Sequence, residues 1–192
     1  MKIIIPILLF FLCSFNLYSQ WGVKGGVNYT KITGSSLQKY KLFGHIGGTY
    51  DVKLSDKWYF QPELLFTSVG CDLKDDRTIL RGGHINIYAL ELPLNLSFRP
   101  TIAEKMNLLL DFGLYARYGL FGNKTYKYHD SSKIDNSPFD AFNRFDTGVN
   151  LGVGLQRNQY YGILSFQRGL SRATKGDSEY HQVFKLSFGY KL

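Results

Sequence analysis

The stretch Tyr88-Ala89-Leu90-Glu91-Leu92-Pro93-Leu94-Asn95-Leu96-Ser97-Phe98 alternates strictly between large apolar residues and small or polar ones. Successive side chains of a β-strand point to opposite faces. A strand here therefore has leucine and aromatic side chains on one face, and Glu91, Asn95 and Ser97 on the other. A helix would mix the two kinds of residue on both faces. The stretch predicts a long β-strand with one apolar and one polar face.

Seven other segments alternate in the same way. They cover residues 21–29, 42–54, 58–67, 107–119, 145–156, 160–167 and 184–192. Short connections at 55–57, 100–105 and 158–159 alternate with longer ones at 31–41, 70–84, 121–144 and 171–180. Short turns at one end and long loops at the other are typical of membrane barrels. The predicted fold is all-β, an eight-stranded antiparallel up-and-down transmembrane β-barrel.

The composition fits one β-rich domain. The chain has 192 residues, a formal net charge of +8, 16% aromatic residues, 20 glycines and two cysteines. The aromatic and apolar content excludes a disordered chain, and two cysteines exclude a disulfide scaffold or a Cys-rich zinc module. Abundant glycine and tyrosine favour strands and turns over a helical bundle.

The N-terminus has the features of a secretory signal. One lysine precedes an apolar run at 3–12, and no other charge occurs before Lys24. The run is too short for a permanent membrane-spanning helix. Ser19 is a small residue at a suitable cleavage position. The sequence predicts a cleaved signal peptide at 1–19 and an outer-membrane β-barrel at 20–192.

Alternation alone does not decide which face of the barrel points outward. A soluble lipocalin-like barrel buries its apolar face, whereas a membrane barrel turns that face to lipid. Here the polar face carries glycine and small uncharged residues, and most charges fall in loops. Aromatic residues gather near the segment ends: Trp21, Tyr29, Tyr50, Trp58, Tyr118, Tyr160 and Tyr190. These features favour the membrane barrel and a location in the bacterial outer membrane.

Eight strands enclose a space that side chains fill. Charges on the predicted inner face are Lys24, Asp51, Glu63, Glu91, Asp111, Arg117, Asp146 and Lys185. Confined charges have to pair or stay hydrated. We expect a polar network that plugs the lumen, with Lys24, Glu63, Glu91, Asp111 and Arg117 as members. A proton or ion path is the alternative interpretation.

Four stretches also carry a family resemblance. They are Gly22-Val23-Lys24-Gly25-Gly26-Val27-Asn28, Gln61-Pro62-Glu63-Leu64-Leu65-Phe66, Leu90-Glu91-Leu92-Pro93-Leu94 and Gly148-Val149-Asn150-Leu151-Gly152-Val153-Gly154. In this order they resemble the PorT-like outer-membrane β-barrel family over the whole mature chain. The resemblance implies an exported eight-stranded barrel without a shared active site. The family's namesake works with a type IX secretion machine.

Signatures of catalysis and of metal binding are weak. His45, His84, His129 and His181 lack metal-ligand spacing, and no nucleophile elbow, P-loop or Rossmann motif occurs. His84 with Asp72 or Asp76 could assist a loop serine, and Asp72, Asp75 and Asp76 could hold Ca²⁺. Lysines and arginines among these acids favour local neutralisation instead. We therefore expect no enzyme activity, no cofactor and no metal.

The long loops carry a positive excess. They hold twelve lysines and arginines against eight acids. This excess suits lipopolysaccharide phosphates, and scattered basic residues on export-facing loops argue against nucleic acid. Tyr126, Tyr128, Phe139 and Phe142 in the longest loop either mark a partner site or pack against neighbouring loops.

The sequence thus predicts a monomeric, non-enzymatic barrel with periplasmic termini that acts through its loops or stabilises the envelope. Its expected partners are the lipid bilayer, lipopolysaccharide and, during biogenesis, the barrel-assembly machinery. The alternatives are a component of a type IX-like secretion or transport assembly, a membrane-embedded enzyme, and a narrow solute pore. The reactivity of Cys71 stays open.

Overall fold

The computed structural model describes residues 19–33, 38–75, 80–128, 133–174 and 179–192. The signal peptide predicted at 1–19 lies outside these ranges, apart from Ser19 at the start of the first strand. Among the described residues, no helix is long and apolar enough to cross a bilayer.

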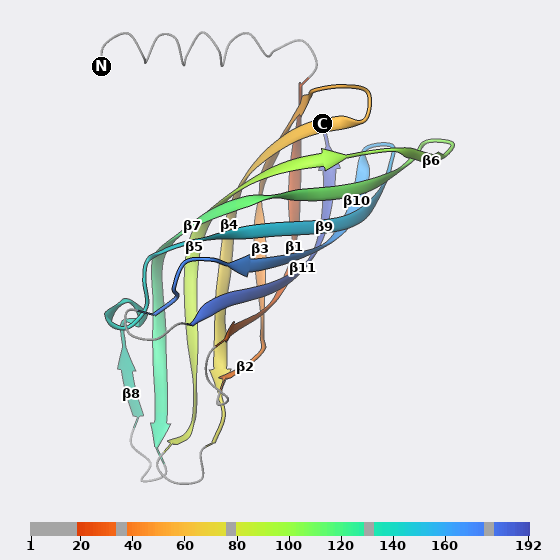
Figure 1. Cartoon of the computed structure of the whole chain (residues 1–192). Helices are drawn as coiled ribbons and strands as arrows, with labels where there is room; N and C mark the ends of the chain where they lie inside the picture. The colour runs from red at the N-terminus through yellow and green to blue at the C-terminus, as the bar shows by residue number, and fades with distance from the viewer. Residues whose placement is uncertain (1–18, 34–37, 76–79, 129–132, 175–178) are drawn as a thin grey trace, which may run out of the picture.

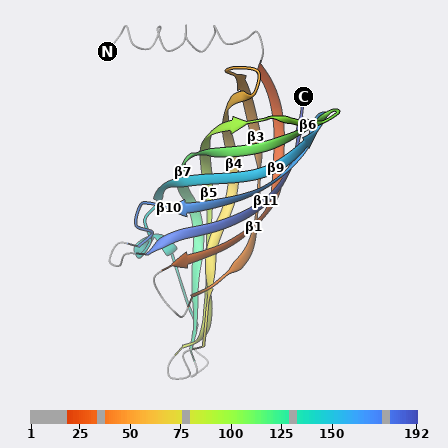
Figure 2. The same ribbon diagram turned by 45° about the vertical axis from the view of Figure 1, so that its right-hand side comes forward.

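Eight long strands form the wall of the molecule (Figures 1 and 2). They are β1 (Ser19–Thr33), β3 (Lys41–Lys53), β4 (Trp58–Leu73), β5 (Leu80–Phe98), β7 (Met106–Tyr128), β9 (Phe145–Arg157), β10 (Tyr160–Gly169) and β11 (Tyr180–Lys191). Each pairs antiparallel with the next long strand, and β1 also pairs with β11. The sheet is therefore a closed eight-stranded up-and-down barrel, which confirms the predicted fold.

Tight turns close one end of the barrel, here called the short-turn end. The turn between β9 and β10 places Asn158 in the left-handed region with φ 55°, and Lys105 has φ 58° before β7. Asparagine tolerates this conformation better than most residues. The short strand β6 (Thr101–Ala103) pairs with β7 in the turn that follows β5. Both ends of the described chain lie at this end, as Figure 1 shows.

The opposite end, here called the long-loop end, contains more strand than predicted. The connection predicted at 70–84 is largely strand, because β4 continues to Leu73 and β5 begins at Leu80. Likewise β7 runs into the loop predicted at 121–144, where β8 (Lys133–Asn136) and the 3-10 helix η1 (Pro138–Asp140) also lie. The short strand β2 (Gln38–Lys39) pairs with β4. In Figure 1 the ends of β4, β5 and β7 extend beyond the other wall strands.

These extensions follow from an apolar core inside the long-loop end. Cys71, Ile85 and Ile87 on the extensions pack with Ile32 and Val183 of the neighbouring wall. Burial of such side chains stabilises strand pairs that polar loop residues alone would not support. The predicted loops were therefore too long, because the alternation continues there with Cys71, Ile85 and Ile87 on the inner face.

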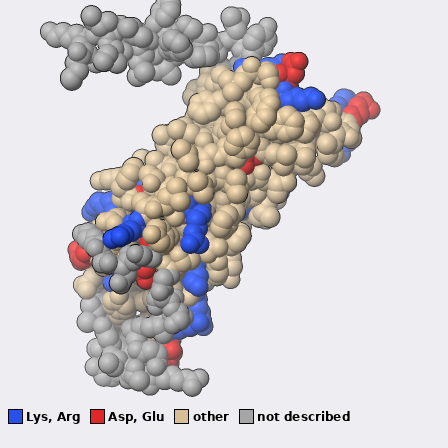
Figure 3. All heavy atoms as spheres, viewed as in Figure 1, with Lys and Arg blue, Asp and Glu red and all other residues tan. Residues whose placement is uncertain are grey.

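The outer face of the wall carries exposed apolar side chains. Leu42, Ile46, Leu64, Leu114, Leu164 and Phe188 are all more than half exposed. Figure 3 shows a surface with few charges over the middle of the molecule and Lys, Arg, Asp and Glu toward its two ends. An apolar band of this kind suits a lipid environment and is rare on soluble monomers.

Candidate functional site

The inner face of the wall holds the charged residues. Five cations and five acids are almost fully buried there: Lys24, Arg99, Arg117, Lys185 and Lys191, with Asp51, Glu63, Glu91, Asp111 and Asp146. A sixth buried acid, Glu179, lies against Gln38 at the long-loop end. The wall charges balance, as an interior poor in water requires.

One cluster, the Glu91 network, centres on Glu91 of β5. Arg117 donates to Oε2 from Nε at 2.9 Å and from Nη2 at 2.8 Å. Lys185 and the Gln167 amide both donate to Oε1. Arg117 also reaches Asp146 at 2.9 Å. Glu91 therefore has partners on β7, β10 and β11.

The strand order makes one of these contacts span the barrel. Around the ring β1-β3-β4-β5-β7-β9-β10-β11, three strands separate β5 from β11 in either direction. The Glu91–Lys185 ion pair therefore joins diametrically opposite walls. Side chains that meet in this way occupy the centre of the lumen.

A second cluster, the Asp51 network, lies toward the short-turn end. The Arg99 guanidinium donates to both carboxylate oxygens of Asp51, and Lys191 contacts Oδ2 at 2.6 Å. The Gln61 amide donates to Oδ1 at 2.6 Å. Arg99 also lies over the Tyr59 ring, 4.4 Å from its centroid. Bidentate pairing of arginine with a carboxylate is among the stronger polar contacts in proteins.

Between the two clusters, Lys24 pairs with Glu63 at 2.8 Å. The Asn95 amide donates to the same carboxylate at 3.1 Å, and the Asn150 amide donates to Asn95 at 2.8 Å. Asp111 faces the glycine position Gly152 of β9, and one of its oxygens has no hydrogen-bond partner among the described residues. Asp111 thus borders the ion pairs without joining one.

The structure therefore brings Lys24 together with Glu63, and Glu91 together with Arg117, but places Asp111 beside these pairs. Sequence reasoning omitted Arg99, Lys191 and Gln167 from the network. Their signal was present: Arg99 shares the strand parity of Glu91, and Lys191 shares that of Lys185.

The long-loop end is covered by parts of two loops. Phe139 of η1 packs so tightly on Gly119 that a Cβ there would lie 2.6 Å from the ring. Arg144 stacks on Phe139 at 4.0 Å and donates to the carbonyl of Gly119. The Asn143 backbone N–H donates to the Ala173 carbonyl and so joins the two loops.

Phe139 and Phe142 are 8% and 4% exposed, so they form part of the apolar core and not an exposed partner site. Of the two readings of the loop aromatics, packing against neighbouring loops is the correct one for these residues. Tyr126 is half-buried on β7, and the Tyr128 side chain lies outside the described residues.

The structure places some of the residues that the sequence suggested for catalysis or Ca²⁺ binding. His84 lies opposite Asp72 in the β4–β5 pair, and Asp72 forms an ion pair with Lys41 at 3.0 Å. Asp76 and His129 lie outside the described residues. Within those residues, no group of three His, Cys, Asp or Glu side chains could hold a metal ion.

Three solved structures are similar to this chain over most of its length. Neisserial surface protein A is 7% identical, with a TM-score of 0.52 over 91% of this chain and 99% of that chain. The attachment invasion locus protein Ail of Yersinia pestis, solved with the heparin analogue sucrose octasulfate, is 15% identical, with a TM-score of 0.49 over 92% of this chain and 100% of that chain. OprG of Pseudomonas aeruginosa is 15% identical, with a TM-score of 0.48 over 91% and 96% of the two chains.

The search of curated proteins finds no match to this chain. A family model does match, over residues 14–173, and its description is outer membrane protein beta-barrel domain. That match covers seven of the eight wall strands, and it agrees with the closed barrel and the apolar outer band. The chain belongs to the outer membrane protein beta-barrel domain family, and it is a protein of the bacterial outer membrane.

Proposed function

We propose that this protein is a non-enzymatic monomeric barrel with a plugged lumen, which acts through its extracellular surface or as a structural component of the envelope. The observation that carries the proposal is the Glu91–Lys185 ion pair between opposite walls. A continuous aqueous path would have to displace this pair and the hydrogen bonds of Arg117 and Gln167 to the same carboxylate.

Two other groups of residues support the plug at other levels along the barrel axis. The Asp51–Arg99–Lys191 cluster narrows the lumen toward the short-turn end. Phe139, Phe142 and the apolar core fill the long-loop end. By the usual asymmetry of outer-membrane barrels, the short-turn end faces the periplasm and the long loops face the exterior. The outer surface of the long-loop end, below which the apolar core closes the lumen, is then available to partners.

Export through a cleaved signal peptide at 1–19 and insertion of residues 20–192 by the barrel-assembly machinery remain part of this proposal. So does contact of the basic loops with lipopolysaccharide. The narrower PorT-like assignment and a role in a type IX-like secretion assembly rest on the sequence resemblance alone. No contact among the described residues favours them.

Conductance across planar lipid bilayers tests the plug. The wild-type barrel is expected to produce no steady ion current. The triple variant Glu91→Ser, Arg117→Ser and Lys185→Ser removes only the crossing contacts. Current steps are therefore expected once Asp51→Ser, Arg99→Ser and Phe139→Ala are added, because these changes remove the Asp51 network and a ring of the apolar core. A matched variant at the exposed turn, Glu104→Ser and Lys105→Ser, should stay silent. A steady wild-type current that the combined variant leaves unchanged contradicts the proposal.

A further inference from the structure

Two cations lie on the outer face of the barrel near the long-loop end. Lys31 of β1 pairs with Gln182 of β11, and Gln182 pairs with Arg168 of β10. The three residues form one row across neighbouring strands, and their side chains share the face of Tyr29, Phe184 and Phe166. Two strand spacings place the Lys31 and Arg168 backbones about 10 Å apart. Long side chains from both positions can therefore meet over Gln182.

These cations differ from those inside the barrel. All five buried wall cations form ion pairs. In the part of the chain that the structure describes, neither Lys31 nor Arg168 has a carboxylate partner. Lys31 lies over the Tyr40 ring, 5.8 Å from its centroid, and Arg168 is exposed. Unpaired cations on a lipid-facing wall are retained most readily where an anionic headgroup meets them.

Arg168 is flanked by neutral neighbours. On the same face, Val149 and Gln182 lie beside it in the strand pairs, Phe166 precedes it on β10, and Leu170 directly follows the end of β10. None carries a negative charge. Asp146 is the acid on the neighbouring strand β9. Its side chain points into the barrel and forms an ion pair with Arg117. The Arg168 guanidinium therefore faces the surroundings of the barrel with no acidic side chain beside it.

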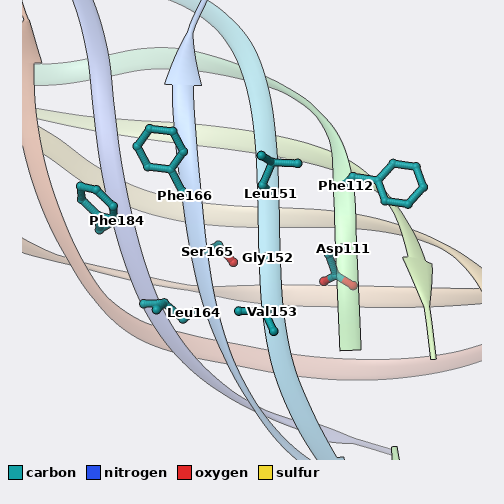
Figure 4. A pocket seen from close by; sticks show the side chains of 9 residues that line it. All are labelled: Asp111, Phe112, Leu151, Gly152, Val153, Leu164, Ser165, Phe166 and Phe184. Carbon is teal, nitrogen blue, oxygen red and sulfur yellow. The ribbon is translucent and has the colours of Figure 1, made fainter. Parts of the chain in front are cut away.

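An apolar groove lies directly next to this row. It has a volume of about 380 Å³ and lies on the outer wall formed by β7, β9, β10 and β11. Figure 4 shows Phe166, Leu151 and Phe112 along one side of it and Leu164 and Val153 along the other. Arg168 is two residues beyond Phe166 on the same face of β10, about 7 Å along the strand. The cations thus lie at one end of a mainly apolar groove, whose lining also includes Asp111 and Ser165.

We propose that Lys31, Gln182 and Arg168 bind the phosphate of an anionic lipid in the outer leaflet, with an acyl chain of that lipid in the groove. The planar Arg168 guanidinium matches phosphate oxygens in a bidentate manner, and Lys31 adds a point charge. The Gln182 amide supplies a donor between them. Continuity with the apolar groove favours a lipid over free phosphate. This site is separate from the plugged lumen and from the loop surface.

Native mass spectrometry of the folded barrel in neutral detergent tests the site. The probes are dioleoyl phosphatidic acid, dioleoyl phosphatidylcholine and inorganic phosphate. Phosphatidic acid is expected to bind most tightly. The Lys31→Gln/Arg168→Gln variant should lose about tenfold to thirtyfold in that affinity, from two cations near a headgroup. The control Arg157→Gln removes an exposed arginine at the short-turn end of β9, beside Tyr160 and Met106, and should change nothing.

A second variant separates the groove from the charges. Val153→Trp puts bulk into the groove and should weaken phosphatidic acid severalfold while leaving Lys31 and Arg168 in place. Heat-dependent gel mobility verifies that each variant is folded. Equal binding of both lipids, an equal loss in Arg157→Gln, or equal affinity for inorganic phosphate and phosphatidic acid would each overturn the proposal.

Discussion

Glu91 and Lys185 form an ion pair across the full width of the barrel, because their strands β5 and β11 are opposite each other in the closed ring. Both side chains are almost completely buried. The pair also connects to Arg117, Asp146 and Gln167, so that one carboxylate links four wall strands. A cross-link of this kind opposes deformation of the wall as well as passage of solutes.

The first prediction concerns the stability of this cluster. Glu91→Leu removes the acceptor and leaves Lys185 buried without a carboxylate, so it should destabilise the barrel by about 3–5 kcal/mol. Adding Lys185→Met should recover at least ~1 kcal/mol, because the orphaned charge is then gone. Urea unfolding in lipid vesicles, followed by gel mobility, measures both values.

A matched control for this cycle is Glu104→Leu with Lys105→Met at the exposed turn, where neither side chain is buried. Its two single changes should each stay within ~0.5 kcal/mol. If the changes in unfolding free energy caused by Glu91→Leu and by Lys185→Met simply add in the double variant, the ion pair contributes no coupling free energy.

The second prediction concerns the cover at the long-loop end. Phe139→Ala removes the ring that fills the space over Gly119 and supports the Arg144 guanidinium. Loss of a buried aromatic ring costs about 3–5 kcal/mol where the whole fold depends on it. Here the cost should appear as local opening, with faster trypsin cleavage at Arg144 and unchanged heat-dependent mobility.

Asp140→Ala is the control for this change, since Asp140 is exposed on the same 3-10 helix. It should leave the cleavage rate at Arg144 unchanged. Equal cleavage rates in wild type and Phe139→Ala would mean that Phe139 does not hold the cover closed.

Strand parity predicted which charges point inward, because a period of two fixes the face of every residue once one face is assigned. Glu91 and Lys185 were placed inside on this ground alone. Their contact could not be predicted, because it depends on the stagger of strands on opposite sides of the ring. Arg99 has the parity of Glu91 and so belongs to the inner face, but its ion pair with Asp51 could not be predicted, because that pair depends on how two different strands are staggered.

The long-loop end was harder to predict than the middle of the barrel. Cys71, Ile85 and Ile87 continue the alternation, but their neighbours Gly70, Asp72 and Gly83 look like loop residues in the sequence. Packing against Phe139 and Phe142, which are far away along the chain, decides that this region is strand. Such contacts join segments that are far apart in the sequence, so the alternation alone does not show that the strands continue here.

The third prediction places the two tryptophans at one membrane interface. Trp21 contacts Tyr50 and Trp58 contacts Phe98, both on the outer face near the short-turn end. Their fluorescence should therefore be quenched more by lipids brominated near the headgroup than by lipids brominated near the chain ends. A tryptophan introduced by Leu186→Trp, in the middle of the band, should show the reverse order in a Trp21→Phe/Trp58→Phe background. Efficient quenching of Trp21 and Trp58 by aqueous iodide alone would contradict the lipid-facing wall.

The fourth prediction concerns Cys71, which lies on β4 beyond Phe66, the last exposed apolar residue of that strand. The thiol is fully buried in the apolar core, and this burial raises its pKa to about 12. Since the thiolate is the reactive form, maleimide at pH 8 should leave Cys71 unlabelled in the folded barrel and label it within minutes in urea. A Cys13→Ser background makes Cys71 the sole thiol, and Ser55→Cys in the exposed turn, with Cys71→Ser, supplies the fast-reacting control. Rapid labelling of folded Cys71 would mean that the apolar core opens readily at the long-loop end. Phe142→Ala, which removes a ring from the same core, should in turn accelerate that labelling.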